Sequence, residues 1–266
     1  MSFNHKKKFG QNFLTDQNDV LERIMEVAKV SETETVLEIG PGEGALTELL
    51  LAAGKKVICV EIDRDLEKIL RRKFDNNPKF TLIMADILTV DFDTQISEKV
   101  KVVANIPYYI TSPIITKLIE NRQYVEDIFI MVQKEVAERI CAKSGKERSV
   151  LTLSVEYFGE ANYLFTIPKQ FFTPPPKVDS AFMSIKLYKD NPYEKLIEEN
   201  EFFKYVKLAF SNKRKNILNN LSSLGIEKSI LKEILESNGF SGNRRAEDFS
   251  IDEFMTLIKI LKAYEE

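Results

Sequence analysis

The chain has 266 residues, of which 44% are hydrophobic and 30% charged, so it can bury a sizeable core as one large domain or as a main domain with a smaller one. No hydrophobic run approaches the length of a membrane span, and we expect neither a transmembrane helix nor a membrane partner. The lysines Lys6–Lys8 stand near the N-terminus without a following apolar run, which disfavours a secretory signal.

Cysteine and histidine are scarce, and this limits the chemistry. Cys59 and Cys141 form no CxxC pair, a pattern that favours a reducing, cytoplasmic compartment over disulfide, metal or redox chemistry. His5 is the only histidine, so Ser–His and Cys–His nucleophile pairs are disfavoured, and we expect no metal site. The net charge is −3, so nucleic-acid binding would require local basic patches.

The first sixteen residues interleave three lysines with phenylalanines, a composition suited to single-stranded RNA. A frayed tail is the usual alternative for a chain terminus. The run Gln11-Asn12-Phe13-Leu14 mixes polar donors with core-like residues, which argues against fraying alone. A helix is predicted to follow over about 17–30.

A predicted strand over 35–40 runs into a glycine-rich turn, Gly40-Pro41-Gly42-Glu43-Gly44-Ala45, and then into a predicted helix over 46–53. This order is typical of the start of a nucleotide-binding βαβ unit. The next predicted strand, 56–61, ends in Glu61, about twenty residues after Gly40, where a carboxylate can bind ribose hydroxyls. The glycines alone are a weak signal, and a solvated strand end is the alternative for Glu61.

Polar residues follow the next two predicted strands as well. Asp86 comes after the strand 80–85, where it could accept a hydrogen bond from an adenine amine, although a surface acid is the simpler alternative. Asn105 comes after the strand 100–104. Open α/β sheets bind ligands at the carboxyl ends of their strands. Five residues fall at or near such ends, which favours a site there: Glu38, Gly40, Glu61, Asp86 and Asn105.

The stretch Asn105-Ile106-Pro107-Tyr108 combines groups that suit a flat base with an exocyclic amine. The Asn105 side-chain oxygen and the Ile106 carbonyl can both accept hydrogen bonds from that amine. Pro107 restricts the backbone and removes a competing donor, and Tyr108 offers a ring face for stacking. For an isolated Asn-x-Pro-Tyr, a turn whose tyrosine covers the core is the simpler interpretation. The neighbouring strand ends favour a base-binding site.

The later chain first continues the α/β pattern. A helix is predicted with Thr111 or Ser112 as its cap, followed by a strand over 127–133, a helix over 134–143, and strands over 150–157, 162–167 and 181–187. The segment Phe171-Phe172-Thr173-Pro174-Pro175-Pro176 is stiffened by its prolines and could hold both phenylalanines at a pocket mouth. A connector whose phenylalanines lie in the core is the alternative.

From about residue 190 the pattern becomes helical, with helices predicted over 201–210, 213–221, 228–238 and 251–263. This change predicts two domains, an α/β domain over 1–189 and a helical domain over 190–266. Two basic clusters in the helical part could bind phosphates, unless they form an ordinary solvated helix face. These clusters are Lys213-Arg214-Lys215 and Arg244-Arg245.

Taken together, the motifs resemble those of the ribosomal RNA adenine dimethylases in type and order, over nearly the whole chain. The matching stretches are Gln11–Leu14, Glu38–Gly42, Glu61, Asp86, Asn105–Tyr108 and Phe172–Ser180. The triple-proline segment, Phe210–Lys215 and Arg245–Ser250 resemble the branch that dimethylates two adjacent adenosines near the 3′ end of small-subunit ribosomal RNA. Tyr109 departs from many relatives, which carry Asn there.

The resemblance implies a Rossmann-like, S-adenosylmethionine-dependent methyltransferase sheet with helices on both faces and a small C-terminal helical domain. It also implies that small-subunit ribosomal RNA, or an immature small ribosomal subunit, is the partner. Nothing in the sequence suggests an obligate dimer, so we expect a monomer. The implied cofactor residues are Asn12, Leu14, Gly40, Glu61, Asp86 and Asn105, and the implied catalytic residues are Asn105, Ile106, Pro107 and Tyr108.

Four alternatives remain at this point. The first is a large-subunit dimethylase that confers antibiotic resistance, and the second is an assembly factor whose main role is to bind an immature ribosomal particle. A nicotinamide-dependent oxidoreductase also fits the glycine pattern, but the Asn-x-Pro-Tyr stretch speaks against it. A small-molecule methyltransferase is disfavoured by the basic-aromatic N-terminus and the basic helical region.

Overall fold

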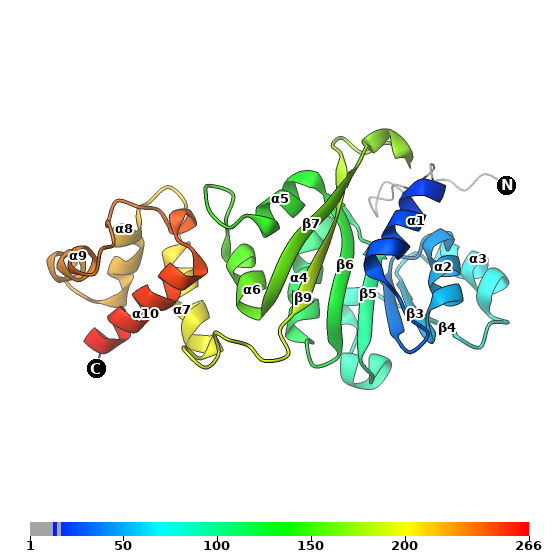
Figure 1. Cartoon of the computed structure of the whole chain (residues 1–266), viewed down its shortest axis with the longest axis horizontal. Helices are drawn as coiled ribbons and strands as arrows, with labels where there is room; N and C mark the ends of the chain where they lie inside the picture. The colour runs from blue at the N-terminus through cyan, green and yellow to red at the C-terminus, as the bar shows by residue number, and fades with distance from the viewer. Residues whose placement is uncertain (1–12, 15–16, 266) are drawn as a thin grey trace. The chain divides into compact units, whose positions relative to one another are not determined.

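The computed structural model describes residues 13–14 and 17–265, and their contacts divide the chain into two compact units (Figure 1). The first unit contains the described residues up to Ala137 together with Glu160–Leu187, and the second contains Glu138–Gly159 and Tyr188 onward. The longer part of the second unit starts at Tyr188, close to the boundary predicted after residue 189. Residues 138–159, which the sequence analysis assigns to the first domain, group with the C-terminal helices instead.

The first unit is built on a seven-stranded sheet with the order β4-β3-β2-β5-β6-β9-β7. Neighbouring strands from β4 to β6 are parallel, and β9 is antiparallel to β6. Central strands such as β2 and β3 are buried along nearly their whole length, as expected for parallel strands covered on both faces. The strands are β2 (Thr35–Ile39), β3 (Lys56–Glu61), β4 (Phe80–Met84), β5 (Val100–Asn105), β6 (Val125–Gln133), β7 (Gly159–Ile167) and β9 (Ser180–Leu187).

Helices cover both faces of this sheet because the chain moves outward from β2 in two directions. The steps β2–β3–β4 go one way and β5–β6 the other, so right-handed crossovers place their helices on opposite faces. The helix α4 accordingly packs against β6, and α2 and α3 pack against β3. This is the doubly wound α/β architecture predicted from the sequence. The helices are α1 (Gln17–Ala28), α2 (Ala45–Ala53), α3 (Arg64–Phe74) and α4 (Thr111–Glu120). Helix α5 (Lys134–Cys141) begins in the first unit and continues into the second, which starts at Glu138.

A short antiparallel pair of strands lies outside the main sheet. Strand β1 (Phe13–Leu14) pairs with β8 (Phe172–Thr173), and Leu14 lies opposite Phe172. Both residues belong to the apolar cluster that joins α1, α2 and α3 to the sheet. The pairing thus holds residues 13–14 against the beginning of the proline-rich segment, with Leu14 and Phe172 separated by 158 positions in the sequence.

The second unit is helical apart from its connecting segments. Its core is rich in aromatic rings: Tyr157 stacks on Phe202 with 4.6 Å between ring centroids, and its hydroxyl donates to the Ile197 carbonyl at 3.0 Å. These contacts are the physical reason why residues 138–159 group with the C-terminal helices. The helices are α6 (Val150–Phe158), α7 (Glu199–Ala209), α8 (Ile217–Leu221), α9 (Lys228–Ser237) and α10 (Ile251–Glu265).

The prediction of a strand over 150–157 was wrong, because this segment forms α6. The segment was predicted to form a strand beside 162–167, but Ser149 and Thr152 form a capping box that starts a helix. Six residues of α6 are buried, so packing in the second unit outweighs the weak intrinsic preference of the segment.

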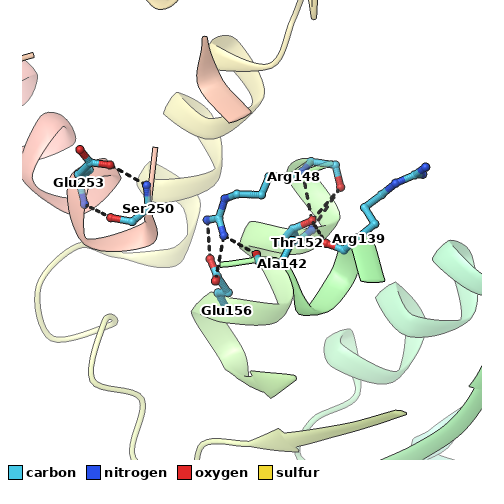
Figure 2. A network of polar contacts seen from close by, with 8 residues as sticks. Arg139, Ala142, Arg148, Thr152, Glu156, Ser250 and Glu253 are labelled. Atoms are coloured by element: carbon cyan, nitrogen blue, oxygen red, sulfur yellow. Dashed lines mark hydrogen bonds and ion pairs between the residues drawn. The ribbon is translucent and has the colours of Figure 1, made fainter. Parts of the chain in front are cut away.

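A buried ion pair fixes the loop before α6 (Figure 2). Both terminal nitrogens of Arg148 donate to the Glu156 carboxylate, at 3.0 and 2.6 Å, and Nη1 also donates to the Ala142 carbonyl at 2.7 Å. The Arg148 side chain is fully buried. A bidentate pair in this setting restricts geometry strongly, so Arg148 connects both ends of the 142–148 loop to α6.

Candidate active site

The first unit contains a cavity at the carboxyl ends of β2, β3, β4 and β5, where the strand order changes direction. Residues from all four strand ends line it, together with Leu14 from β1 and Met131 from β6. The structure therefore brings together most of the residues predicted from the sequence. Those that line the cavity are Leu14, Glu38, Gly40, Glu61, Asp86, Asn105, Ile106, Pro107 and Tyr108.

The glycine-rich turn forms the cavity wall next to β5. Gly40 has a φ of 70°, and a side chain there would begin 3.7 Å from the Asn105 carbonyl oxygen. The turn also requires Gly44, since a Cβ atom there would lie 2.4 Å from the Phe74 ring. Glycine at both positions allows a positive φ and close packing, so the backbone itself faces the cavity.

Glu61 connects this turn to the end of β3. One carboxylate oxygen accepts from the backbone nitrogens of Ile62 and Asp63, at 2.9 and 2.8 Å, and the other accepts from Gly42 at 3.3 Å. Burial raises the pKa of Glu61, and these backbone hydrogen bonds oppose the rise. The carboxylate is therefore held in place at the cavity wall by the chain around it.

Asp86 is fixed in a similar way one strand further along. Its Oδ1 atom accepts from the Leu88 backbone nitrogen at 3.0 Å and caps a short 3₁₀ turn (Ile87–Thr89). Its second oxygen receives no hydrogen bond from the residues that the structure describes. A fixed carboxylate with one free oxygen at a cavity can accept a hydrogen bond from a ligand.

Asn105 and Ile106 present two adjacent acceptors to the cavity. Within residues 13–14 and 17–265, the Asn105 carboxamide makes no hydrogen bond, and the Ile106 carbonyl accepts none. Asn105 is half-buried, and Ile106 is 1% exposed. Polar groups in such positions are normally paired with protein or solvent, so this pair is suited to hold a ligand with two adjacent donor hydrogens.

Tyr108 begins a second 3₁₀ turn (Tyr108–Ile110) after Pro107. Its backbone carbonyl accepts from the Thr111 hydroxyl at 3.2 Å, and its ring hydroxyl is hydrogen-bonded to the Ser180 hydroxyl. Burial raises the pKa of the Tyr108 phenol, and its bond to Ser180 opposes the rise. The ring therefore remains neutral at physiological pH and borders the cavity in one orientation.

Glu38 is a cavity residue to which the sequence analysis assigned no role. It is 2% exposed, and its Oε2 atom accepts from Thr47 Oγ1 at 2.6 Å and from Cys59 Sγ at 3.4 Å. Burial raises the pKa of Glu38 to about 7. Its position near the end of β2 was a signal for its importance, but burial and pairing could be seen only in the folded chain.

The phenylalanines of the proline-rich segment lie outside the cavity lining. Phe172 is 2% exposed and packs in the apolar cluster opposite Leu14, while Phe171 is half-buried against the same cluster. Stacking of either ring on a base stays a prediction, and for Phe172 it would require the ring to leave the core. Asn12 and Lys6–Lys8 lie outside the described residues.

The basic residues of the second unit differ from one another. Lys213, Arg214 and Lys215 are exposed on a turn, because α8 begins only after its cap Asn216 and not at 213 as predicted. Arg244 donates two hydrogen bonds to Glu253, at 2.7 and 2.9 Å, so its guanidinium is already paired. Arg245 is about half exposed. The Ile217 nitrogen donates to the Arg244 carbonyl at 2.7 Å, which brings the two basic segments together.

The described residues contain neither a membrane-spanning helix nor a cluster of metal ligands. No helix between residues 17 and 265 is long and apolar enough to cross a membrane. Over the same part of the chain, no group of three or more His, Cys, Asp or Glu side chains could hold a metal ion.

Comparisons with known proteins agree with this arrangement. The sequence is 60% identical to "Ribosomal RNA small subunit methyltransferase A" of Fusobacterium nucleatum over 262 residues, which cover 98% of this chain and 99% of that protein. It is 42% identical to the protein of the same name from Caldanaerobacter subterraneus, covering 96% of this chain and 97% of that one.

Solved structures give the same result. The 23S rRNA methyltransferase ErmE is 29% identical with a TM-score of 0.76, covering 94% of this chain and all of that one. A dimethyladenosine transferase from Plasmodium falciparum is 28% identical with a TM-score of 0.76, covering 95% and 98%. The family model described as "Ribosomal RNA adenine dimethylase" matches residues 2–263. The chain therefore belongs to the ribosomal RNA adenine dimethylase family.

Proposed function

We propose that the protein uses S-adenosylmethionine to dimethylate N6 of two adjacent adenosines near the 3′ end of small-subunit ribosomal RNA. The observation that carries the proposal is a pair of acceptors, Asn105 and the Ile106 carbonyl, which have no partner among the described residues and lie beside the Tyr108 ring at one cavity. An adenine amine has two hydrogens to donate and a flat ring to stack. The names of the two small-subunit relatives favour small-subunit RNA as the substrate.

The cavity residues fit S-adenosylmethionine, which supplies an electrophilic methyl group on its sulfonium when bound. The Gly40 turn leaves room for a ligand to approach the backbone, because no side chain fills it. Glu61 would bind the ribose hydroxyls, as carboxylates do at the end of the second strand in such folds. The Asp86 oxygen that accepts nothing from the described part of the chain would accept from the cofactor's adenine amine.

Asn105 and Ile106 would act on the target amine. The N6 lone pair of adenine is delocalised into the ring, so the free amine is a weak nucleophile. Hydrogen bonds from both N6 hydrogens to these two acceptors would favour a pyramidal nitrogen and aim its lone pair. The rate gain would then come from positioning and electrostatics.

Tyr108 would hold the target base after it leaves its stack in the RNA. A neutral ring bordering the cavity offers a stacking surface that is worth about 1–3 kcal/mol per base. The exposed turn with Lys213, Arg214 and Lys215 would contact phosphates. We also propose that the enzyme is a cytoplasmic monomer and that its substrate is an immature small ribosomal subunit.

The test is methyl transfer from labelled S-adenosylmethionine to small ribosomal subunits purified from cells that lack this activity, followed by nucleoside analysis. We expect N6,N6-dimethyladenosine in the small-subunit RNA. Transfer to large-subunit RNA alone would move the protein to the resistance branch of the family. Cofactor binding without transfer to either RNA would favour a role as an assembly factor.

A further inference from the structure

The chain just after the proline-rich segment contributes to the site through Ser180. Ser180 is the first residue of β9 and is fully buried, and its hydroxyl is hydrogen-bonded to the Tyr108 hydroxyl. Ser180 is not among the residues that line the cavity. Any effect of Ser180 on a bound base must therefore pass through the tyrosine ring.

We propose that Ser180 is a positioning residue that orients the Tyr108 ring for stacking on the target base. This inference rests on the proposed function, since it assumes that Tyr108 receives an adenine. It assigns a task to a side chain that lies 72 positions away from Tyr108 in the sequence.

The Tyr108 ring is held at two points. Its backbone carbonyl accepts from Thr111 at 3.2 Å, which fixes the turn after Pro107, and its hydroxyl is bound by Ser180. A tyrosine side chain has two rotatable bonds, so an anchor at each end leaves the ring little freedom. A ring in a fixed orientation need not be ordered when the base enters, which lowers the entropy cost of stacking.

Ser180 is itself fixed by its neighbours. It pairs with Gln133 at the end of β6, and the adjacent Asp179 carbonyl accepts from the Lys134 nitrogen at 3.0 Å. The Asp179 side chain accepts from the Lys169 nitrogen at 3.0 Å, which closes the proline-rich segment into a loop. The hydroxyl that meets Tyr108 thus projects from a sheet, and a rigid support of this kind is what a functional side chain requires.

A double-mutant cycle tests the proposal by removing the hydrogen bond from each side. Ser180→Ala and Tyr108→Phe each delete one hydroxyl, and Tyr108→Phe retains the aromatic ring. We expect each variant to lower kcat for methyl transfer about tenfold, with the Kd for S-adenosylmethionine unchanged by calorimetry. The double variant should lose about tenfold and not a hundredfold, because both changes remove the same bond.

The control is Ser184→Ala, which makes the same change four residues further along β9. Ser184 is 2% exposed and lies on the same sheet face, but it does not line the cavity. This variant should keep the wild-type kcat, and Ser180→Thr, which retains a hydroxyl, should recover most of it. Melting temperatures of all variants show whether a kcat loss follows from lost stability.

Three outcomes would overturn the proposal. The first is a wild-type kcat in Ser180→Ala, and the second is a double variant whose loss equals the product of the two single losses. The third is a loss of kcat in both Ser180→Ala and Ser184→Ala that follows the decrease in their melting temperatures. The wild-type protein is measured in parallel on the same subunits. If the wild type transfers no methyl group, the proposed function fails. If the wild type is active and Ser180→Ala is equally active, only the positioning role of Ser180 is removed.

Discussion

Lys101 and Asn105 lie near opposite ends of β5, and their side chains are bonded in opposite ways. Near the amino end, the Lys101 ammonium pairs with Glu34 at 2.6 Å and donates to the carbonyls of Ala28 and Lys29 at 3.1 and 3.3 Å. At the carboxyl end, Asn105 has no partner within the part of the chain that the structure describes. Both residues are largely withdrawn from solvent, so the difference lies in pairing.

Other strand ends show the same difference, although Glu61 and Glu38 at the carboxyl ends are paired within the chain. At the amino ends, Glu98 accepts from Thr35 and from Lys56, each at 2.7 Å, and so joins β2 to β3. At the carboxyl ends, the Ile106 carbonyl and one oxygen of Asp86 accept nothing from residues 13–14 and 17–265. Paired polar groups stabilise a fold, while unpaired ones cost stability unless a ligand satisfies them. The sheet therefore separates its structural end from its functional end.

Among the substitutions that test this difference between the two ends of the sheet, we expect the largest effect at Asn105. Asn105→Ala should lower kcat for methyl transfer by two to three orders of magnitude, or about 3–4 kcal/mol, because it removes one of two groups that orient the amine. The free energy of unfolding and the affinity for RNA should change little. Parallel activity, denaturation and RNA-binding measurements check this, with Asn121→Ala as a control outside the cavity. An equal loss of RNA affinity would mean that Asn105 is structural.

Glu38 combines both features, since it borders the cavity but is paired with Thr47 as the structural residues are. Its folded-state pKa is raised from 4.5 to about 7, so between these values the folded chain holds a proton that the unfolded chain has lost. Stability must then fall as pH rises from about 4.5 to 7 and level off above. Glu38→Gln should remove up to about 3 kcal/mol of this dependence.

Urea denaturation of the wild type and of Glu38→Gln from pH 4.5 to 8 measures how the free energy of unfolding of each protein depends on pH. Other acids titrate in the same range, so the informative quantity is the gap between the two curves. We expect the variant to be the less pH-dependent of the two. Parallel curves would show that Glu38 is ionised throughout this range.

A substitution of Lys101 tests how much the paired groups at the amino end of β5 contribute to stability. Lys101→Met should lower the free energy of unfolding by about 2–3 kcal/mol, because Glu34 and two helix-end carbonyls lose a buried cation. Lys56→Met is the matched control at the same end of the sheet, where the ion pair is about one-third exposed and should contribute less than about 1 kcal/mol. The Kd for S-adenosylmethionine of the folded protein should stay the same in both, and a weaker Kd in Lys101→Met would contradict the separation.

Glu61 should give the smallest effect of the four. Glu61→Gln replaces a carboxylate that accepts from Gly42, Ile62 and Asp63 with an amide that has fewer acceptor positions. We expect the Kd for S-adenosylmethionine to rise about tenfold, or about 1.4 kcal/mol. Calorimetry on this variant and on Glu67→Gln, a partly exposed acid on α3 outside the cavity lining, checks the result. Equal affinities of the two variants for S-adenosylmethionine would remove Glu61 from the site.

Local signals in the sequence were enough to predict the α/β fold and the strand ends that carry the site. The strand over 56–61 and its terminal Glu61 follow from a hydrophobic run and an acid, and the structure places both as expected. The same approach failed for α6, where a strand was predicted but a capping box with aromatic packing produced a helix. Periodicity is a weak guide where tertiary contacts outweigh local preference.

The sequence by itself determined which residue types stand at the strand ends, because strand periodicity and the position of a turn are local properties of the chain. Only the tertiary structure decided which polar groups are paired. Ser180 is hydrogen-bonded to Tyr108, Lys101 donates to the Ala28 carbonyl at the end of α1, and Arg244 donates to Glu253. Contacts between residues distant in sequence depend on how strands and helices pack, and no local pattern records them.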